Sequence, residues 1–327
     1  MIDDSDLGYN IYTLDEFKFD YGNILHDVEV EYTTSGTPIY DDEGNIINAV
    51  ILCYMYNGNY SSVIDFHQLI GPDSPLAELN FFYISISSLG HPNSCSPSTT
   101  NLKYDFPSYS IKNRVDFKRK FLVEKFNITN VLGIFGVGSG GYEAYTWACE
   151  YPDEMEFLII TSSSFKTNGH RYIASRVIDS IIDSSDAYYD DLYSESLSKI
   201  MVTINRLIYS QHFSKKIFQN LTKFEIDALM DDFVDEGLFM DIYDLKYGND
   251  AILNFDVEDK LSNIKAKTLV VSSSEDIYFS PEFDVYPLKG IIENLEIFIF
   301  DDNDFVFYND YSVFVDVFKE FLNEFKK

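Results

Sequence analysis

The chain has 327 residues, of which 24 are Lys or Arg and 54 are Asp or Glu, so its formal net charge at pH 7 is −30. This charge disfavours nucleic acid and anionic membrane surfaces as partners, because both are themselves negatively charged. A hydrophobic content of 46% and an aromatic content of 17% exclude a disordered acidic tail and favour a large folded core.

The first residues and the cysteines bear on cellular location. The opening sequence MIDDSDLGYN is acidic where a signal peptide would be basic and then apolar, and no apolar run approaches the ~20 residues that span a bilayer. Cys53, Cys95 and Cys149 form neither a CxxC pair nor an even disulfide framework. We therefore expect a cytoplasmic protein, and no metal site, because the Cys and His residues lack ligand spacing.

Seven short apolar runs, each closed by turn residues, predict buried strands. In chain order these runs are residues 28–32, 49–54, 81–85, 131–135, 157–161, 268–272 and 295–300. Helical patterns alternate with the later strands, over residues 111–126, 142–148 and 311–325. This alternation predicts a mostly parallel sheet with helices on both faces.

The alternation is interrupted between residues 169 and 255. This stretch has no convincing strand but several helical patterns, including residues 196–209 and 223–239. A helical insertion between two halves of a sheet commonly covers the carboxyl edge of the sheet, where ligand sites of α/β proteins lie. We therefore expect an α/β core of residues 1–168 and 256–327 with a helical cap of residues 169–255.

A glycine-rich turn, residues 133–144, leads from a predicted strand into a predicted helix. Gly136, Gly138 and Gly141 match the GxGxxG dinucleotide fingerprint, but serines occupy the region about 20 residues on where that fingerprint needs an acid. A P-loop is a poor match because its lysine is absent. The remaining interpretations are a nucleophile elbow, G-x-S-x-G, and a purely structural turn.

The elbow fits the sequence in two registers. With Gly136 and Gly140 as the outer glycines, Gly138 stands at the position of the nucleophile itself. With Ser139 as the nucleophile, the bulky Val137 takes the place of the first glycine, where crowding is greatest.

The segments that flank this turn point to a family. They occur in order at residues 48–58, 69–72, 94–100, 105–107, 147–148, 151–153 and 274–281. Together with the elbow they resemble the homoserine O-acetyltransferase family of α/β hydrolases over nearly the whole chain. The resemblance implies an α/β-hydrolase fold, with a mostly parallel eight-stranded sheet, a helical cap after the sixth strand and often a dimer. It also implies acetyl transfer to homoserine through an acyl-serine, with acetyl-CoA as co-substrate and no bound cofactor.

The resemblance also assigns the catalytic positions. The family's nucleophile stands nine residues before the Trp-Ala pair, which is Gly138 in this chain, and the triad acid corresponds to Asp276. The two oxyanion-hole amides correspond to Tyr56 and Ser139. Asn303 stands where the family has its histidine, and no histidine follows Asp276 in the sequence.

The substrate-binding positions are also altered. Tyr209 matches a cap-helix tyrosine of the family, but the arginine seven residues before it is replaced by Val202. Arg206 lies one helical turn from Val202, on roughly the same face, and is the candidate to bind the substrate carboxylate from this displaced position. Asp304 retains the acid that the family turns toward the substrate amine.

Three functions follow as hypotheses. The leading one is a catalytically inactive family member that keeps a site for a small metabolite, amino-acid-like or acyl-CoA, or for a partner chain. The second is an active acyltransferase or esterase that uses Ser139 with a relocated base, for which His170 is favoured over His91 and His212. The third is an interaction subunit that pairs with an active paralogue, and a homodimer through the cap helices is a related expectation.

Overall fold

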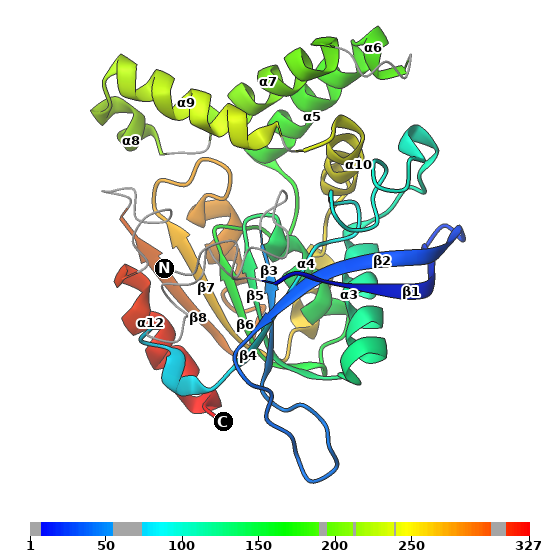
Figure 1. The fold of residues 1–327 in the computed structure, drawn as a ribbon. Coiled ribbons are helices and arrows are strands. Elements are labelled where there is room, and N and C mark those ends of the chain that lie inside the picture. Colours follow the sequence, from blue (N-terminus) through cyan, green and yellow to red (C-terminus); the bar gives the residue numbers. More distant parts are fainter. Residues whose placement is uncertain (1–7, 55–73, 190–194, 212–213, 239, 302–311) are drawn as a thin grey trace.

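The structure, a computed structural model, describes residues 8–54, 74–189, 195–211, 214–238, 240–301 and 312–327. Eight strands form one sheet in the order β1-β2-β4-β3-β5-β6-β7-β8 (Figure 1). Their bounds are β1 (Asn10–Lys18), β2 (Ile24–Ser35), β3 (Ala49–Cys53), β4 (Phe82–Ile86), β5 (Val131–Val137), β6 (Met155–Thr161), β7 (Lys267–Ser273) and β8 (Leu295–Phe300). The pairs β1–β2 and β2–β4 are antiparallel and all other pairs are parallel, which confirms the mostly parallel sheet.

Helices cover both faces of the sheet, as the alternating pattern predicted. On one face, α3 (Ile111–Phe126) and α4 (Gly140–Glu150) bury their apolar side chains in the larger core cluster. On the other face, α12 (Ser312–Leu322) packs in a second cluster, which includes Phe314, Phe318 and Phe321. The short helical turns are η2 (Ala77–Leu79), η3 (Lys103–Asp105), η4 (Glu258–Asn263), η5 (Pro281–Val285), η6 (Tyr286–Leu288) and η7 (Asn323–Phe325).

All seven predicted strands form, with ends that differ by a few residues, but β1 was not predicted. This strand pairs with β2 as an antiparallel hairpin at one edge of the sheet. Only Leu14 and Phe17 of its nine residues are buried. An edge strand that is mostly exposed lacks the apolar run by which the other strands were recognised.

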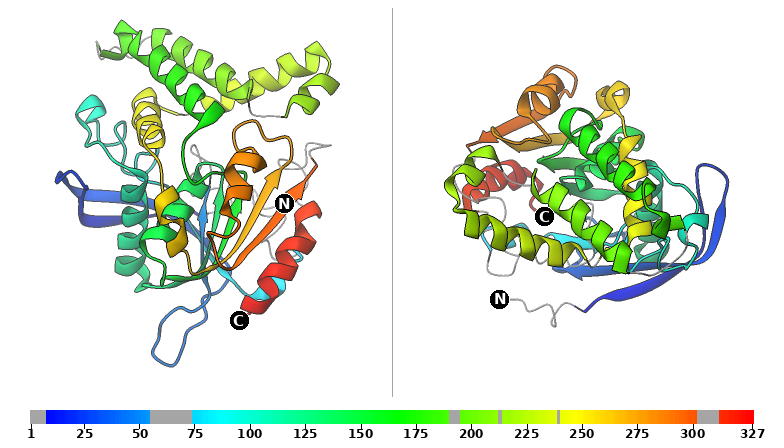
Figure 2. Two further views of the ribbon diagram at one scale, coloured as in Figure 1. Left: turned by 180° about the vertical axis from the view of Figure 1, so that it is seen from behind. Right: turned by 90° about the horizontal axis from the view of Figure 1, so that it is seen from above.

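In the described part of the chain, six α-helices lie between β6 and β7. They are α5 (Gly169–Asp183), α6 (Asp186–Tyr189), α7 (Glu195–Tyr209), α8 (Lys215–Asn220), α9 (Lys223–Gly237) and α10 (Ile242–Leu253). Figures 1 and 2 show α5 to α9 stacked above the sheet, at the edge where its parallel strands end. Helices α5, α6, α7 and α10 share a hydrophobic cluster of their own, which includes Ile182, Met201 and Tyr243.

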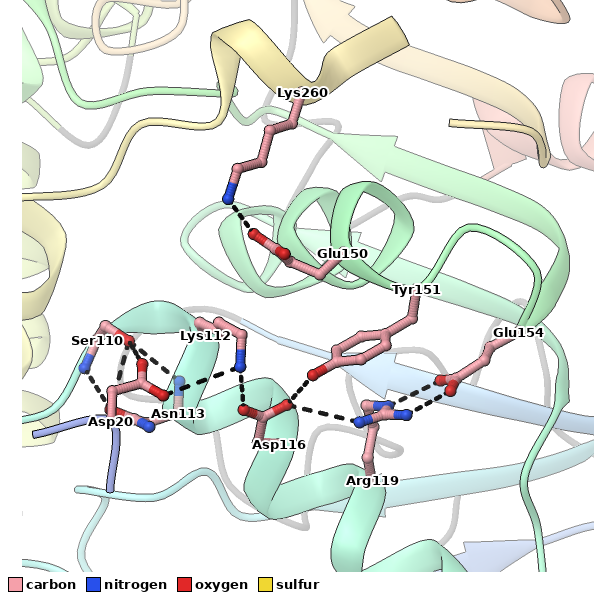
Figure 3. A network of polar contacts seen from close by, with 10 residues as sticks. All are labelled: Asp20, Ser110, Lys112, Asn113, Asp116, Arg119, Glu150, Tyr151, Glu154 and Lys260. Atoms are coloured by element: carbon pink, nitrogen blue, oxygen red, sulfur yellow. Dashed lines mark hydrogen bonds and ion pairs between the residues drawn. The ribbon is translucent and has the colours of Figure 1, made fainter. Parts of the chain in front are cut away.

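A polar network joins α3 to the end of α4 (Figure 3). The Tyr151 hydroxyl donates to Asp116 Oδ1 (2.5 Å), and the Arg119 guanidinium lies 3.3 Å from the centroid of the Tyr151 ring. Arg119 also pairs with Glu154, whose Oε2 accepts from Trp147 Nε1 (2.9 Å). Two of the segments noted in the sequence, at residues 147–148 and 151–153, therefore fix the helix that follows the glycine-rich turn.

Candidate functional site

The glycine-rich turn connects the end of β5 to the start of α4. Gly138 has φ +55°, in the left-handed region where a residue with a Cβ is strained, whereas Ser139 has φ −67° and ψ −17°. Within residues 136–141, all of which the structure describes, Gly138 alone has a positive φ. Its amide donates to the Thr161 carbonyl of β6 (3.0 Å), which fixes the turn against the neighbouring strand.

The residues two positions before and after Gly138 have no room for a side chain. A Cβ on Gly136 would lie 2.7 Å from Ala144 Cβ, and one on Gly140 would lie 2.1 Å from the Cys53 carbonyl oxygen. Since the second obstacle is backbone, β3 or α4 would have to move to accept it. The close-packed turn is therefore centred on Gly138.

Ser139 occupies the N-cap position of α4 but does not cap it. Its side chain is 8% exposed, and Oγ has no hydrogen-bond partner among the described residues. The hydroxyls of Tyr142 in α4 and Ser163 after β6 are buried in the same condition, again with respect to the described part of the chain. Buried polar atoms are normally hydrogen-bonded, so these three hydroxyls call for water or a ligand.

Asp276 follows β7, at the same edge of the sheet as Gly138. Its Oδ1 accepts hydrogen bonds from the amides of Tyr278 (2.9 Å) and Phe279 (2.8 Å), which fix the carboxylate to its own loop. Burial raises the pKa of Tyr278 to about 12, so its hydroxyl is protonated near neutral pH.

A buried ion pair lies between α4 and α3. Glu143 contacts Lys118 Nζ (2.7 Å) and Arg114 (3.7 Å), both from α3, and accepts from Ser88 Oγ (2.8 Å). Burial alone would raise the pKa of the Glu143 carboxyl, but the charges of Lys118 and Arg114 hold it below its usual value. Lys118 also donates to Cys53 Sγ (3.7 Å), so the network reaches the end of β3 beside Gly140.

No described histidine is hydrogen-bonded to Ser139. His170 is exposed in the first turn of α5. His91 is buried, and its Nδ1 lies 2.6 Å from the Pro92 carbonyl oxygen. The third candidate base, His212, lies outside the described residues. His26, which was not a candidate, is exposed near Glu16.

The predicted substrate-binding residues fall in different places. Tyr209 is buried in the cap, where its hydroxyl donates to the Ile226 carbonyl (3.1 Å). On the same helix, Val202 is half-buried and Arg206 is exposed. The positions of Tyr56, Asn303 and Asp304 lie outside the described residues.

Comparison with known proteins shows which family this chain resembles. No family model matches the chain. A probable acyltransferase of Methanothermobacter thermautotrophicus is 39% identical over 290 residues, covering 89% of each chain. A homoserine O-acetyltransferase of Haemophilus influenzae is 25% identical over 314 residues, covering 83% of this chain and 84% of the relative.

The chain belongs to the homoserine O-acetyltransferase family of α/β hydrolases. The crystal structure of the homoserine O-acetyltransferase from Bacillus anthracis superposes with a TM-score of 0.82 at 19% identity, covering 97% of this chain and 98% of that one. This likeness confirms the predicted α/β-hydrolase fold. Among the described residues, no helix is long and apolar enough to cross a membrane, and no cluster of side chains is suited to hold a metal ion.

Sequence reasoning did not single out Tyr142, Ser163 or the Glu143 ion pair. A signal for the ion pair was present, because Arg114 and Lys118 are four residues apart within an otherwise amphipathic helical pattern. The hydroxyls had no such signal, since serine and tyrosine are common at buried and exposed sites alike.

Proposed function

We propose that this member of the homoserine O-acetyltransferase family does not catalyse acyl transfer and instead binds a small metabolite, amino-acid-like or acyl-bearing, beneath the cap. The observation that carries the proposal is the left-handed φ of +55° at Gly138. In a nucleophile elbow the strained residue of the turn is the one that presents the attacking oxygen. A glycine at this position has no atom to attack with.

The missing histidine supports the same proposal. Serine acyl transfer needs a base that accepts the hydroxyl proton and an acid that orients this base. Asp276 remains for the second role, but the family's histidine position holds Asn303. An asparagine amide cannot accept a proton near neutral pH.

Binding is supported by what remains of the site. The hydroxyls of Ser139, Tyr142 and Ser163 are buried and make no normal hydrogen bond among the described residues. Helices α5 to α9 lie above the edge of the sheet at which β5 ends and the turn begins (Figure 1). A ligand or ordered water that accepts from these hydroxyls would remove the cost of burying them unpaired.

A second candidate function is acyl transfer or ester hydrolysis through Ser139. It is favoured by the buried hydroxyl at the start of α4 and by His170, which is adjacent in sequence to Arg171, a residue in contact with Tyr278. In this case a fluorophosphonate probe would label Ser139 rapidly, and both Ser139→Ala and His170→Ala would abolish turnover. The proposed function predicts little labelling and no loss.

The direct test restores the two missing groups. The double variant Gly138→Ser/Asn303→His should hydrolyse p-nitrophenyl acetate at least ~10-fold faster than wild type, yet below the ~10^4 of a complete triad. The matched control is Gly138→Ala/Asn303→His, which carries the same backbone strain and the same histidine but no nucleophile. It should stay at the wild-type rate.

Two results would overturn the proposal. One is a folded double variant no faster than its Gly138→Ala control, because the site is then not a triad that lacks two members. The other is rapid wild-type hydrolysis that Ser139→Ala removes. Acetylation of homoserine by acetyl-CoA should stay weak in the double variant unless Val202→Arg is added.

A further inference from the structure

Arg171 joins the first cap helix to the loop that follows β7. Its Nη1 donates to Oγ of Ser175 (2.9 Å), a fully buried residue that lies four positions further along α5. Its guanidinium carbon lies 5.6 Å from the centroid of the Tyr278 ring. Because Tyr278 also donates its amide to Asp276, Arg171 lies beside the loop that carries the candidate triad acid.

Among the described residues, Arg171 forms no ion pair. Arg114, Arg119 and Arg176 each have a carboxylate oxygen within 4.0 Å, but Arg171 has none among the described residues. The chain carries 54 acidic residues against 24 basic ones. A half-buried guanidinium that escapes pairing in so acidic a chain is available to an anion from outside.

A buried hydroxyl lies close to the same guanidinium. Tyr142 is fully buried, with its ring stacked on Phe255 at a centroid distance of 4.2 Å. Burial raises the pKa of its hydroxyl, whereas the charge of Arg171 and polar side-chain interactions with Thr167 and Arg171 act against that rise, so the hydroxyl lies near both of these side chains. These interactions are looser than a hydrogen bond of normal length and angle, which the hydroxyl does not make within the described part of the chain.

The start of α5 adds backbone donors. The N-cap residue Asn168 makes no side-chain hydrogen bond to the helix, and α5 continues for 15 residues. The first-turn amides of a helix have no partner within the helix and lie at the positive end of its dipole. Arg171 belongs to this first turn, so charge, hydroxyl and amides are contributed by one small region.

We propose that Arg171, the Tyr142 hydroxyl and the first turn of α5 bind the carboxylate of a small ligand. This inference rests on the proposed function and specifies the class of metabolite. A guanidinium offers two parallel N–H donors that match a carboxylate, and the hydroxyl supplies a third donor. A singly charged carboxylate suits the site better than a dianion, because one guanidinium must offset the repulsion of a chain with net charge −30.

Thermal unfolding with acetate and acetamide tests the inference. At about 20 mM ligand and constant ionic strength, acetate should raise the wild-type Tm by about 2 °C, whereas the uncharged acetamide should not. Arg171→Gln and Tyr142→Phe should each remove the shift. Arg176→Gln, on the same helix but ion-paired with Asp179 (3.2 Å), is the matched control and should retain it.

An unchanged acetate shift in Arg171→Gln, or no shift in wild type, would overturn the inference. Arg171→Lys, which keeps the charge and loses the paired donors, should show a reduced shift and replaces Arg171→Gln if that variant fails to unfold cooperatively. Ester hydrolysis is measured on the same preparations. Rapid hydrolysis with the acetate shift intact overturns the proposed function alone, whereas inactivity without a shift overturns this inference alone.

Discussion

Buried polar groups near α4 are stabilised differently on the side of α3 and on the side of the glycine-rich turn. Toward α3, Glu143 is buried beside Lys118 and Arg114, so charge is balanced within the protein. Toward the turn and β6, the hydroxyls of Ser139 and Ser163 have no partner among the described residues. The ion pair fixes the helix to α3, so the hydroxyls beside the turn are not needed for that contact and can serve a ligand.

The largest expected effect comes from breaking the charged side. Glu143→Ala leaves the Lys118 ammonium, 1% exposed, without its carboxylate, and should lower the free energy of unfolding by about 3–5 kcal/mol. Urea denaturation measures this loss. Asp153→Ala removes an ion pair with Lys265 whose side chains are 80% and 64% exposed, so it should cause no measurable change. Equal losses in the two variants would show that Glu143 does not hold the helix.

An intermediate effect concerns how the free energy of unfolding depends on pH, because buried carboxyl groups of this chain differ in the direction of their pKa shifts. Whereas Lys118 and Arg114 keep the pKa of Glu143 low against the effect of burial, burial raises the pKa of Asp284 from 3.8 to about 6, although Ser164 Oγ donates to its Oδ1 (2.7 Å). A raised carboxyl pKa favours the folded state at low pH, and this contribution is lost as pH rises through about 6.

The expected gain from Asp284 on going from pH 7 to pH 5 is about 1 kcal/mol. Asp284→Asn keeps the oxygen acceptor for Ser164 and cannot titrate, so it should remove this part of the pH dependence. The measurement is urea unfolding of both proteins at several pH values. Identical slopes for wild type and Asp284→Asn between pH 5 and 7 would contradict the assignment.

The smallest expected effect is on the hydroxyl side. Ser139→Ala removes a hydroxyl that has no partner in the described part of the chain, so the free energy of unfolding should change by less than about 0.5 kcal/mol. Ser88→Ala, the matched change on the charged side, removes a donor to Glu143 (2.8 Å) and should cost about 1–2 kcal/mol. A large loss in Ser139→Ala would show that its hydroxyl is used within the fold.

The sheet and its helices could be predicted because burial on both faces leaves apolar runs in the sequence. The run at residues 131–135 marks a central strand whose residues are all buried, and helix α3 has the predicted bounds. By contrast, β1 depends on its pairing with β2, which no local pattern encodes.

The candidate site was predictable in part. Spacing from Trp147 and the family resemblance indicated Gly138 as the centre of the elbow, and the structure adds the positive φ there. Arg171 and Tyr142 could not be paired from sequence, because they lie 29 positions apart on two helices and meet only through tertiary packing. The assignments to Tyr56, Asn303 and Asp304 remain predictions.

The left-handed backbone at Gly138 has an evolutionary consequence. A side chain at such a φ costs about 1–2 kcal/mol, which a catalytic serine imposes on its host fold. In a lineage that is not selected for turnover, glycine relieves this strain, while Gly136 and Gly140 preserve the turn because their neighbours leave no room for a Cβ. Selection for stability can therefore remove the nucleophile and keep the elbow, so that the turn outlasts the chemistry for which it is shaped.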